Sequence, residues 1–360
     1  MEFKPNFEAL QPYFQAYWNC EILDKVALSV TAPKQPGWEP AVSWRQPQAV
    51  YQQSPDVTLE AFEDWLNHTF FGGLATPCFH PNLGPDVFSG FLGVNLNFSE
   101  HSRGTSWANW QGKKFDYADL EQLTLEESNP YYQKILTLTK LALERGKGRY
   151  LVGITDLHAG FDSLCVLRGG PQIACLDLVE NQEGVKRTML RLFDIWKKIY
   201  DDYYSLISPW QKGTSTWIDI YAPGKMYPVQ NDFSCLVSPE MYREFFLPEL
   251  LAEINYLDYS IYHLDGIEAL QHLDILLDIA RLNAIQWVPG AKYREESISC
   301  WFPLYQKIQE KKKAIVVYPR VEEIPLVLEN LKPEGLLISV GCANEDEART
   351  VMKKLGWNDD

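Results

Sequence analysis

His263 and Asp265 are the two residues whose spacing points most directly to chemistry. They close the apolar run Tyr262-His263-Leu264-Asp265-Gly266 and stand two positions apart, so both side chains leave the same face if the run is a strand. An imidazole and a carboxylate on one face can bind one metal ion or exchange a proton with one substrate atom. A hydrogen-bonded pair without a metal explains the spacing equally well, because His-x-Asp occurs by chance in many strands.

Cys342 offers a third type of metal ligand from a distant part of the chain. It follows the apolar run 335–341, so all three side chains reach the same rim if both runs are strands of one barrel. A catalytic zinc ion uses three protein ligands of these types and keeps one position open. The sequence therefore predicts a zinc site of His263, Asp265 and Cys342. The alternative for Cys342 is a small buried residue after a glycine turn.

Other polar residues follow apolar runs at the positions where a barrel of parallel strands carries its chemistry. Asp156 is interpreted either as the N-cap of the helix that follows it or as a site residue. Asp232 is available for a substrate, because Ser238 is the better cap for the next helix. The remaining residues expected to line the same mouth and contact a substrate are His80, Asn82, Trp287 and Tyr318. The alternative for His80 is a surface loop residue, and Trp287 and Tyr318 are equally well explained as walls of the core or the pocket.

Composition excludes several classes of protein. The 360 residues carry a formal net charge of −15, which disfavours DNA, RNA and anionic membranes as partners because these recruit basic patches. The seven cysteines are odd in number and scattered, so we expect free thiols in a reducing cytoplasm and no disulfide framework. No secretion signal or apolar run of membrane-spanning length is visible.

Strand-like and helical segments alternate along most of the chain, which favours parallel strands joined by helices. An open sheet of this kind normally carries a Gly-rich phosphate-binding turn, and the sequence has none. We therefore predict an α/β fold, a (β/α)8 TIM barrel, over residues 61–360. Residues 1–60 contain many prolines and are predicted to be an N-terminal extension packed on the barrel. The clearest strand candidates are 149–154, 217–220, 260–264, 284–288, 314–318 and 336–340.

The sequence resembles the uroporphyrinogen decarboxylase superfamily from about Asp156 to the C-terminus. The resemblance implies an eight-stranded α/β barrel with its site at the C-terminal face, and it adds Arg168 to the residues expected to bind a substrate. Each matching segment is weak alone, and together they are specific. The segments are Asp156-Leu157-His158-Ala159-Gly160 with Leu167-Arg168-Gly169, Ser238-Pro239-Glu240-Met241-Tyr242 with Phe246-Leu247-Pro248, Tyr262 to Gly266, and Ser339-Val340-Gly341-Cys342.

Two branches of this superfamily carry different chemistry. The tetrapyrrole decarboxylases have an N-terminal arginine-rich signature, which residues 16–21 lack, and a mouth rich in aspartates repels a polycarboxylate. The zinc-dependent methyltransferases hold zinc with a His-x-Cys pair and a later Cys. This chain matches them at His263 and Cys342 but has Asp265 in place of a thiolate. A carboxylate is a harder ligand, so such a zinc ion would be the stronger Lewis acid.

The resemblance therefore implies a zinc-dependent methyltransferase that moves a methyl group from a corrinoid, held by a partner protein, to a thiol or similar acceptor. Asp232 would orient this small-molecule acceptor, and Asp156 would shape the pocket. One alternative is a metal-independent decarboxylase or lyase that uses Asp232 and His263 as acid and base. The other is a barrel that binds a ligand without catalysis. By analogy, two barrels of the family would pair through their mouths as a homodimer.

Overall fold

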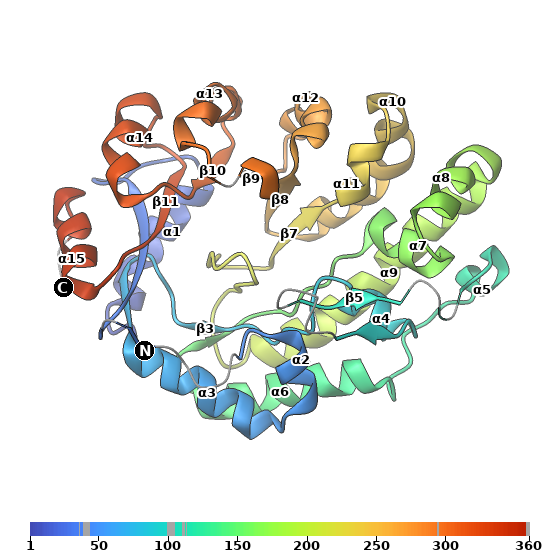
Figure 1. The fold of residues 1–360 in the computed structure, drawn as a ribbon, viewed down its shortest axis with the longest axis horizontal. Coiled ribbons are helices and arrows are strands. Elements are labelled where there is room, and N and C mark those ends of the chain that lie inside the picture. The colour runs from blue at the N-terminus through green and yellow to red at the C-terminus, as the bar shows by residue number, and fades with distance from the viewer. Residues whose placement is uncertain are drawn as a thin grey trace.

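The computed structural model describes residues 1–35, 37–38, 44–98, 105–109, 112, 114–293 and 295–357. It shows a mixed α/β fold in which helices surround a mostly parallel sheet (Figure 1). The strands are β1 (Ala27–Pro33), β2 (Thr69–Gly73), β3 (Cys78–Phe79), β4 (Leu96–Asn97), β5 (Trp107–Ala108), β6 (Leu151–Val152), β7 (Met226–Gln230), β8 (Tyr259–Asp265), β9 (Ala284–Val288), β10 (Ala314–Val317) and β11 (Leu336–Gly341).

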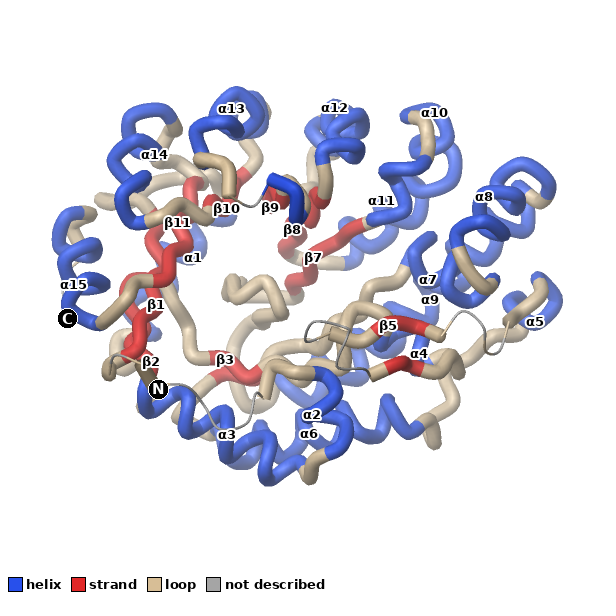
Figure 2. The backbone as a smooth tube through the Cα atoms, in the orientation of Figure 1, coloured by secondary structure: helices blue, strands red, loops and turns tan. Residues whose placement is uncertain are grey.

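The helices follow most of the strands and lie outside them (Figure 2). They are α1 (Gln11–Trp18), α2 (Pro47–Gln52), α3 (Pro55–His68), α4 (Val87–Phe91), α5 (Tyr117–Glu121), α6 (Pro130–Gly146), α7 (Gly160–Arg168), α8 (Pro171–Glu180), α9 (Gln182–Ile207), α10 (Pro239–Met241), α11 (Leu247–Tyr256), α12 (Leu273–Leu277), α13 (Phe302–Glu310), α14 (Ile324–Asn330) and α15 (Glu345–Lys354). Within the described residues, none of these helices combines the length and the apolar character needed to cross a membrane.

The seven-stranded sheet has the order β2-β1-β11-β10-β9-β8-β7. Strand β1 pairs in parallel with β11, so the first and last long strands of the chain are neighbours. Strand β2 is the exception to the parallel order, since it pairs antiparallel with β1. Strands β3 and β6 form a separate parallel pair. Parallel strands place their carboxyl ends at one edge, so residues that follow these strands can meet there.

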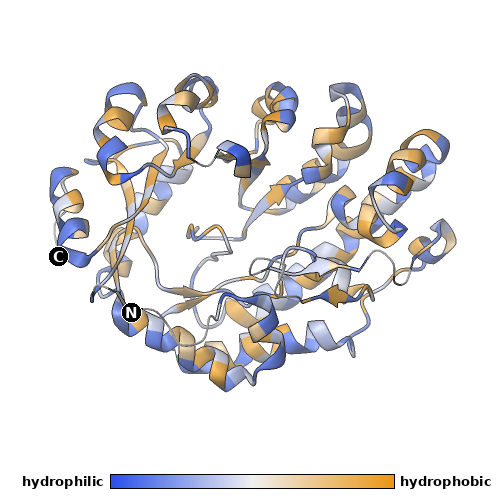
Figure 3. Cartoon of the chain, viewed as in Figure 1, coloured by the Kyte–Doolittle hydropathy of each residue, from blue (hydrophilic) through white to orange (hydrophobic). Residues whose placement is uncertain are grey.

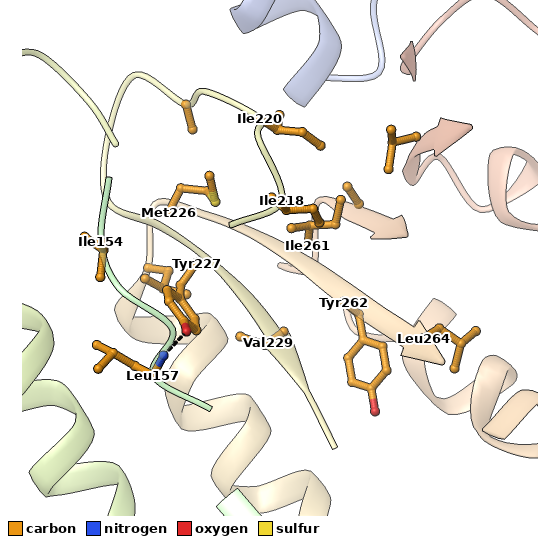
Figure 4. Close-up of a cluster of buried hydrophobic side chains, with 14 of the residues drawn as sticks. Ile154, Leu157, Ile218, Ile220, Met226, Tyr227, Val229, Ile261, Tyr262 and Leu264 are labelled. Atoms are coloured by element: carbon orange, nitrogen blue, oxygen red, sulfur yellow. Dashed lines mark hydrogen bonds between the residues drawn. The ribbon is translucent and has the colours of Figure 1, made fainter. Parts of the chain in front are cut away.

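The core consists of strands that are buried on both faces, as expected when helices cover a parallel sheet. All four residues of β10 are buried, and Ile261 and Tyr262 of β8 are at most 1% exposed. The side chains of Ile261 and Tyr262 lie among residues of β7 and of the segment around Ile218 (Figure 4). The helices turn apolar faces inward and hydrophilic faces outward (Figure 3). This arrangement explains the alternation of apolar runs and amphipathic segments in the sequence.

Two sequence-based predictions about the elements are wrong. Residues 1–60, predicted to be an extension packed on the barrel, contain β1, which lies inside the sheet between β2 and β11. The proline-rich stretch that suggested an extension begins at the last residue of that strand. The apolar segment 217–220 is a turn and not a strand. Its residue Asp219 has φ of 57°, a left-handed conformation that ends a strand and that Asp tolerates better than most residues.

Candidate functional site

Two adjoining cavities lie beside the carboxyl ends of several strands. The larger, of about 670 Å³, borders Tyr318 after β10 and Cys342 after β11. The smaller, of about 110 Å³, borders Asp156 and His80. Arg45 and Asp219 line both cavities, so the two adjoin. Aromatic side chains line much of the larger one, in particular Trp38, Trp65 and Phe71.

His80 and Asp219 form an imidazole–carboxylate pair in the smaller cavity, where His80 Nδ1 lies 3.3 Å from Asp219 Oδ1. His80 is buried, and burial lowers its pKa to about 4 although Asp219 favours the charged form. The imidazole is therefore neutral at neutral pH. Gly153 permits this packing, because a Cβ at that position would lie 2.1 Å from His80 Cδ2. His80 thus lines the predicted mouth as a neutral hydrogen-bonding group.

The carboxyl group of Asp156 borders the smaller cavity, and Tyr227 of β7 holds it by a hydrogen bond. The hydroxyl of Tyr227 donates a hydrogen bond of 3.1 Å to Asp156 Oδ1 and accepts one from the backbone N–H of Leu157 (Figure 4). Burial raises the pKa of Asp156 to about 7, and this effect outweighs the attraction of His158. The carboxyl group of Asp156 therefore gains or loses its proton in the neutral pH range. The predicted role of Asp156 as a helix cap is wrong, since α7 begins only after Ala159.

His158 supplies a buried positive charge beside Asp156. Its Nε2 lies 2.8 Å from Asp162 Oδ2, and Asp162 also accepts hydrogen bonds from the backbone N–H groups of Asp232 and Phe233. Burial alone lowers the pKa of His158, but Asp162 and other nearby carboxylates outweigh it and raise the pKa to about 10. Asp162 therefore fixes both the charge of His158 and the position of the turn after β7.

Gln230 contacts the second ring nitrogen of His158. The Gln230 Nε2 atom lies 2.7 Å from His158 Nδ1, while Gln230 Oε1 is buried without a hydrogen-bond partner among the described residues. A protonated imidazole donates from both nitrogens. A half-turn of the Gln230 amide exchanges its two atoms and lets Oε1 accept a hydrogen bond from His158 Nδ1. The surroundings of His158 therefore fit an imidazolium ion.

Asp232 lies at the outer edge of this group. It begins the 3₁₀ turn Asp232–Leu236, and more than a third of its surface is exposed. Desolvation by the surrounding protein raises its pKa, the carboxylate of Asp162 adds to this, and the imidazoles of His158 and His263 oppose it. Asp232 is therefore close enough to His158 and His263 for both imidazoles to influence its pKa.

His263 is held in one orientation by Gln286 of the neighbouring strand. Its Nδ1 lies 2.6 Å from Gln286 Oε1, and Gln286 Nε2 donates to the hydroxyl of Tyr318 at 2.6 Å. Because Gln286 uses its amide hydrogen for Tyr318, its oxygen accepts from Nδ1 of His263, which places the proton of the neutral ring on Nδ1. Nε2 then carries the lone pair. Trp217 packs edge-on against the ring at 5.1 Å.

The three predicted zinc ligands come from two places in the structure. His263 and Asp265 are partly buried on β8, whereas Cys342 lines the larger cavity beyond β11. Burial, with a smaller effect of Glu347, raises the pKa of the Cys342 thiol to about 11. In the described part of the chain, no three His, Cys, Asp or Glu side chains gather in a metal-binding arrangement. The three donors do not fit zinc in this arrangement, and the zinc site stays a prediction.

The other predicted substrate contacts differ in where they lie. Asn82 lines the smaller cavity and Tyr318 lines the larger one. Arg168 makes two hydrogen bonds to the carboxylate of Asp177, of 2.6 and 3.1 Å, and stands outside both cavities. Trp287 is 1% exposed and packs against Trp301 in the core. The cavities therefore bring together Asn82 and Tyr318 but neither Arg168 nor Trp287.

Several residues of this site were missed from the sequence. His158 and Asp162 stand four positions apart across the start of α7, a spacing that could have identified them as a pair. Tyr227 carries no such signal, because it acts on a partner from another strand. Gln286 stands in the apolar run 284–288, which marks it as a residue near a strand end, but its contact with His263 depends on the pairing of β8 with β9. Comparison of the chain with protein-family models and with curated proteins finds no match.

Proposed function

We propose that the chain is an eight-stranded (β/α)8 barrel enzyme that catalyses a metal-independent acid–base reaction, the decarboxylation of a small organic acid. The observation that carries this proposal is Asp156, a carboxyl group that holds a proton near neutral pH and opens on a cavity. A general acid works best when its pKa is close to the operating pH. The barrel is supported by the parallel contact of β1 with β11.

The residues around Asp156 suit this reaction. In decarboxylation the bond between the substrate carbon and its carboxylate breaks, carbon dioxide leaves, and the electron pair stays on the carbon. That carbon then takes the proton of Asp156, which regains one from solvent through the cavity. His158 lines neither cavity, but its positive charge acts on Asp156, so it would add a favourable potential for the negative charge that develops beside Asp156. Arg45, which lines both cavities, can hold a further anionic group of the substrate.

A decarboxylation assay tests the proposal. We would incubate the protein with oxaloacetate, a β-keto acid, and 4-hydroxybenzoate, an aromatic acid, and measure carbon dioxide release in the presence of a chelator. We expect release that falls by about a hundredfold or more in Asp156→Asn and is retained in Asp194→Asn, an exposed residue of α9. Release that persists in Asp156→Asn, or that stops with the chelator, would contradict the proposal.

The zinc-dependent methyltransferase implied by the family resemblance is the second candidate. One observation favours it, since Gln286 leaves Nε2 of His263 as the free nitrogen, the atom that a metal would need. This candidate requires Cys342 to move toward His263 and to lose its proton. It therefore depends on a change of structure, whereas the acid–base proposal uses the groups where they stand.

A further inference from the structure

Two glutamates are buried behind the site on one face of α11. Glu249 and Glu253 stand four residues apart, so their side chains are neighbours along the helix. They are 4% and 5% exposed, and each lies close enough to the other to affect its pKa. Two buried carboxylates side by side repel each other, which favours a proton on one of them. The pair therefore holds at least one proton.

No lysine or arginine in the described part of the chain pairs with these two carboxyl groups. The ionisable groups that face them are Asp162 and His158 near the start of α7, Tyr227 on β7, and Tyr242 on the π-helical turn Tyr242–Phe246. Burial raises the pKa of Glu249 to about 7, and burial together with the neighbouring Glu249 raises the pKa of Glu253 well above its usual range. Burying two unpaired charges is costly, so one carboxyl group stays neutral while the other ionises near neutral pH.

Gly160 connects this pair to the site. It lies between His158 and Asp162, and a Cβ at Gly160 would lie 3.2 Å from Glu249 Oε2. The missing side chain thus lets the carboxyl group of Glu249 approach the start of α7. Asn231 Nδ2 lies 3.8 Å from the same point. Asn231 is 6% exposed, and its Oδ1 and Glu249 Oε1 have no hydrogen-bond partner among the residues described.

We propose that Glu249 and Glu253 are positioning residues that share one proton and place the remaining negative charge behind His158, so that this imidazole stays cationic beside Asp156. The inference rests on the proposed function for its catalytic meaning, because a cation at His158 is what stabilises the developing negative charge. The charges of Glu249, Glu253 and His158 are properties of the protein without substrate. They can therefore be measured without an activity assay.

The first measurement is the titration of His158 by NMR, with its signal identified by its loss in His158→Gln. In the wild-type protein we expect His158 to remain protonated beyond pH 8. Glu249→Gln removes the negative charge, so the midpoint should fall by about 0.5 to 1 pH unit. The control is Glu63→Gln, since Glu63 pairs with Arg145 and Arg149 away from the site. This control should leave the midpoint of His158 unchanged.

The second measurement is infrared spectroscopy at about pH 9, where Asp156 is ionised. We expect the carbonyl stretch of a protonated carboxylic acid in the wild type and its loss in Glu253→Gln. If that stretch is absent in the wild type, the proton-sharing pair is wrong. If the His158 midpoint does not move in Glu249→Gln, the positioning role is wrong. Should Glu249→Gln not fold, Glu249→Asp keeps the charge but draws it back along a side chain shorter by one methylene group, so the midpoint should fall in the same direction by a smaller amount. Failure of the decarboxylation assay would leave both measurements intact.

Discussion

Asp156→Asn should make the protein more stable at alkaline pH while it removes activity. The carboxyl group has a pKa of about 7 in the folded protein and 3.8 in the unfolded chain. A carboxyl group whose pKa is raised by folding disfavours the folded state once it must ionise there. The penalty grows from about pH 4, where the unfolded chain begins to lose its proton, and levels off above about pH 7. Asparagine has no charge to bury, so the variant escapes the penalty.

The size of this effect follows from the two pKa values. One pKa unit is worth about 1.4 kcal/mol, so the ceiling is about 4 kcal/mol above pH 7. Asp156 opens on a cavity and is partly exposed, and solvent there reduces the cost. We therefore expect a gain of roughly 2 kcal/mol for Asp156→Asn over the wild type at about pH 8.5, relative to about pH 4.5.

Urea unfolding of both proteins at the two pH values measures this difference. Glu249 also has a raised pKa, but it is present in both proteins, so comparison of the variant with the wild type isolates Asp156. Asp194→Asn controls for the exchange of Asp by Asn at an exposed position. If the free energy of unfolding of Asp156→Asn differs from that of the wild type by the same amount at both pH values, Asp156 does not hold its proton as argued.

Three further predictions concern the site and its surroundings. Tyr227→Phe removes the hydrogen bond to Asp156. The pH at which kcat/KM falls on the alkaline side should therefore move upward, and the rate should drop by about tenfold. If a pH–rate measurement shows an unchanged profile, Tyr227 does not affect the pKa of Asp156. Arg168→Ala breaks the partly buried ion pair between Arg168 and Asp177. This variant should lower the free energy of unfolding by roughly 2–4 kcal/mol and leave KM unchanged. A raised KM with unchanged stability would instead support a role of Arg168 in substrate binding. If the zinc hypothesis holds, elemental analysis after dialysis against zinc should find one ion per chain, lost in the double variant His263→Ala with Cys342→Ala. Less than one ion in the wild type would remove that candidate.

Position in the sequence indicated which side chains come near the cavities. His80, Asn82, Asp156 and Tyr318 are predicted from the ends of apolar runs, and all four line a cavity; their contact with a substrate stays a prediction. Trp287 is predicted in the same way and Arg168 from the family resemblance, yet Trp287 packs against Trp301 and Arg168 pairs with Asp177. Residue type and strand position indicate where a side chain can lie. They do not indicate which neighbouring residues form hydrogen bonds or ion pairs with the polar atoms of that side chain.

The amino-acid sequence by itself determined the alternation of strands and helices, the acidic surface and the polar residues after the strands, because these depend on local patterning and composition. Only the tertiary structure decided that β1 belongs inside the sheet, that Tyr227 bonds Asp156, and that Asp162 keeps His158 charged. Burial and the distances between charges set a pKa, and both arise from segments that are remote in the chain. The proton on Asp156 is therefore a consequence of packing that no local pattern encodes.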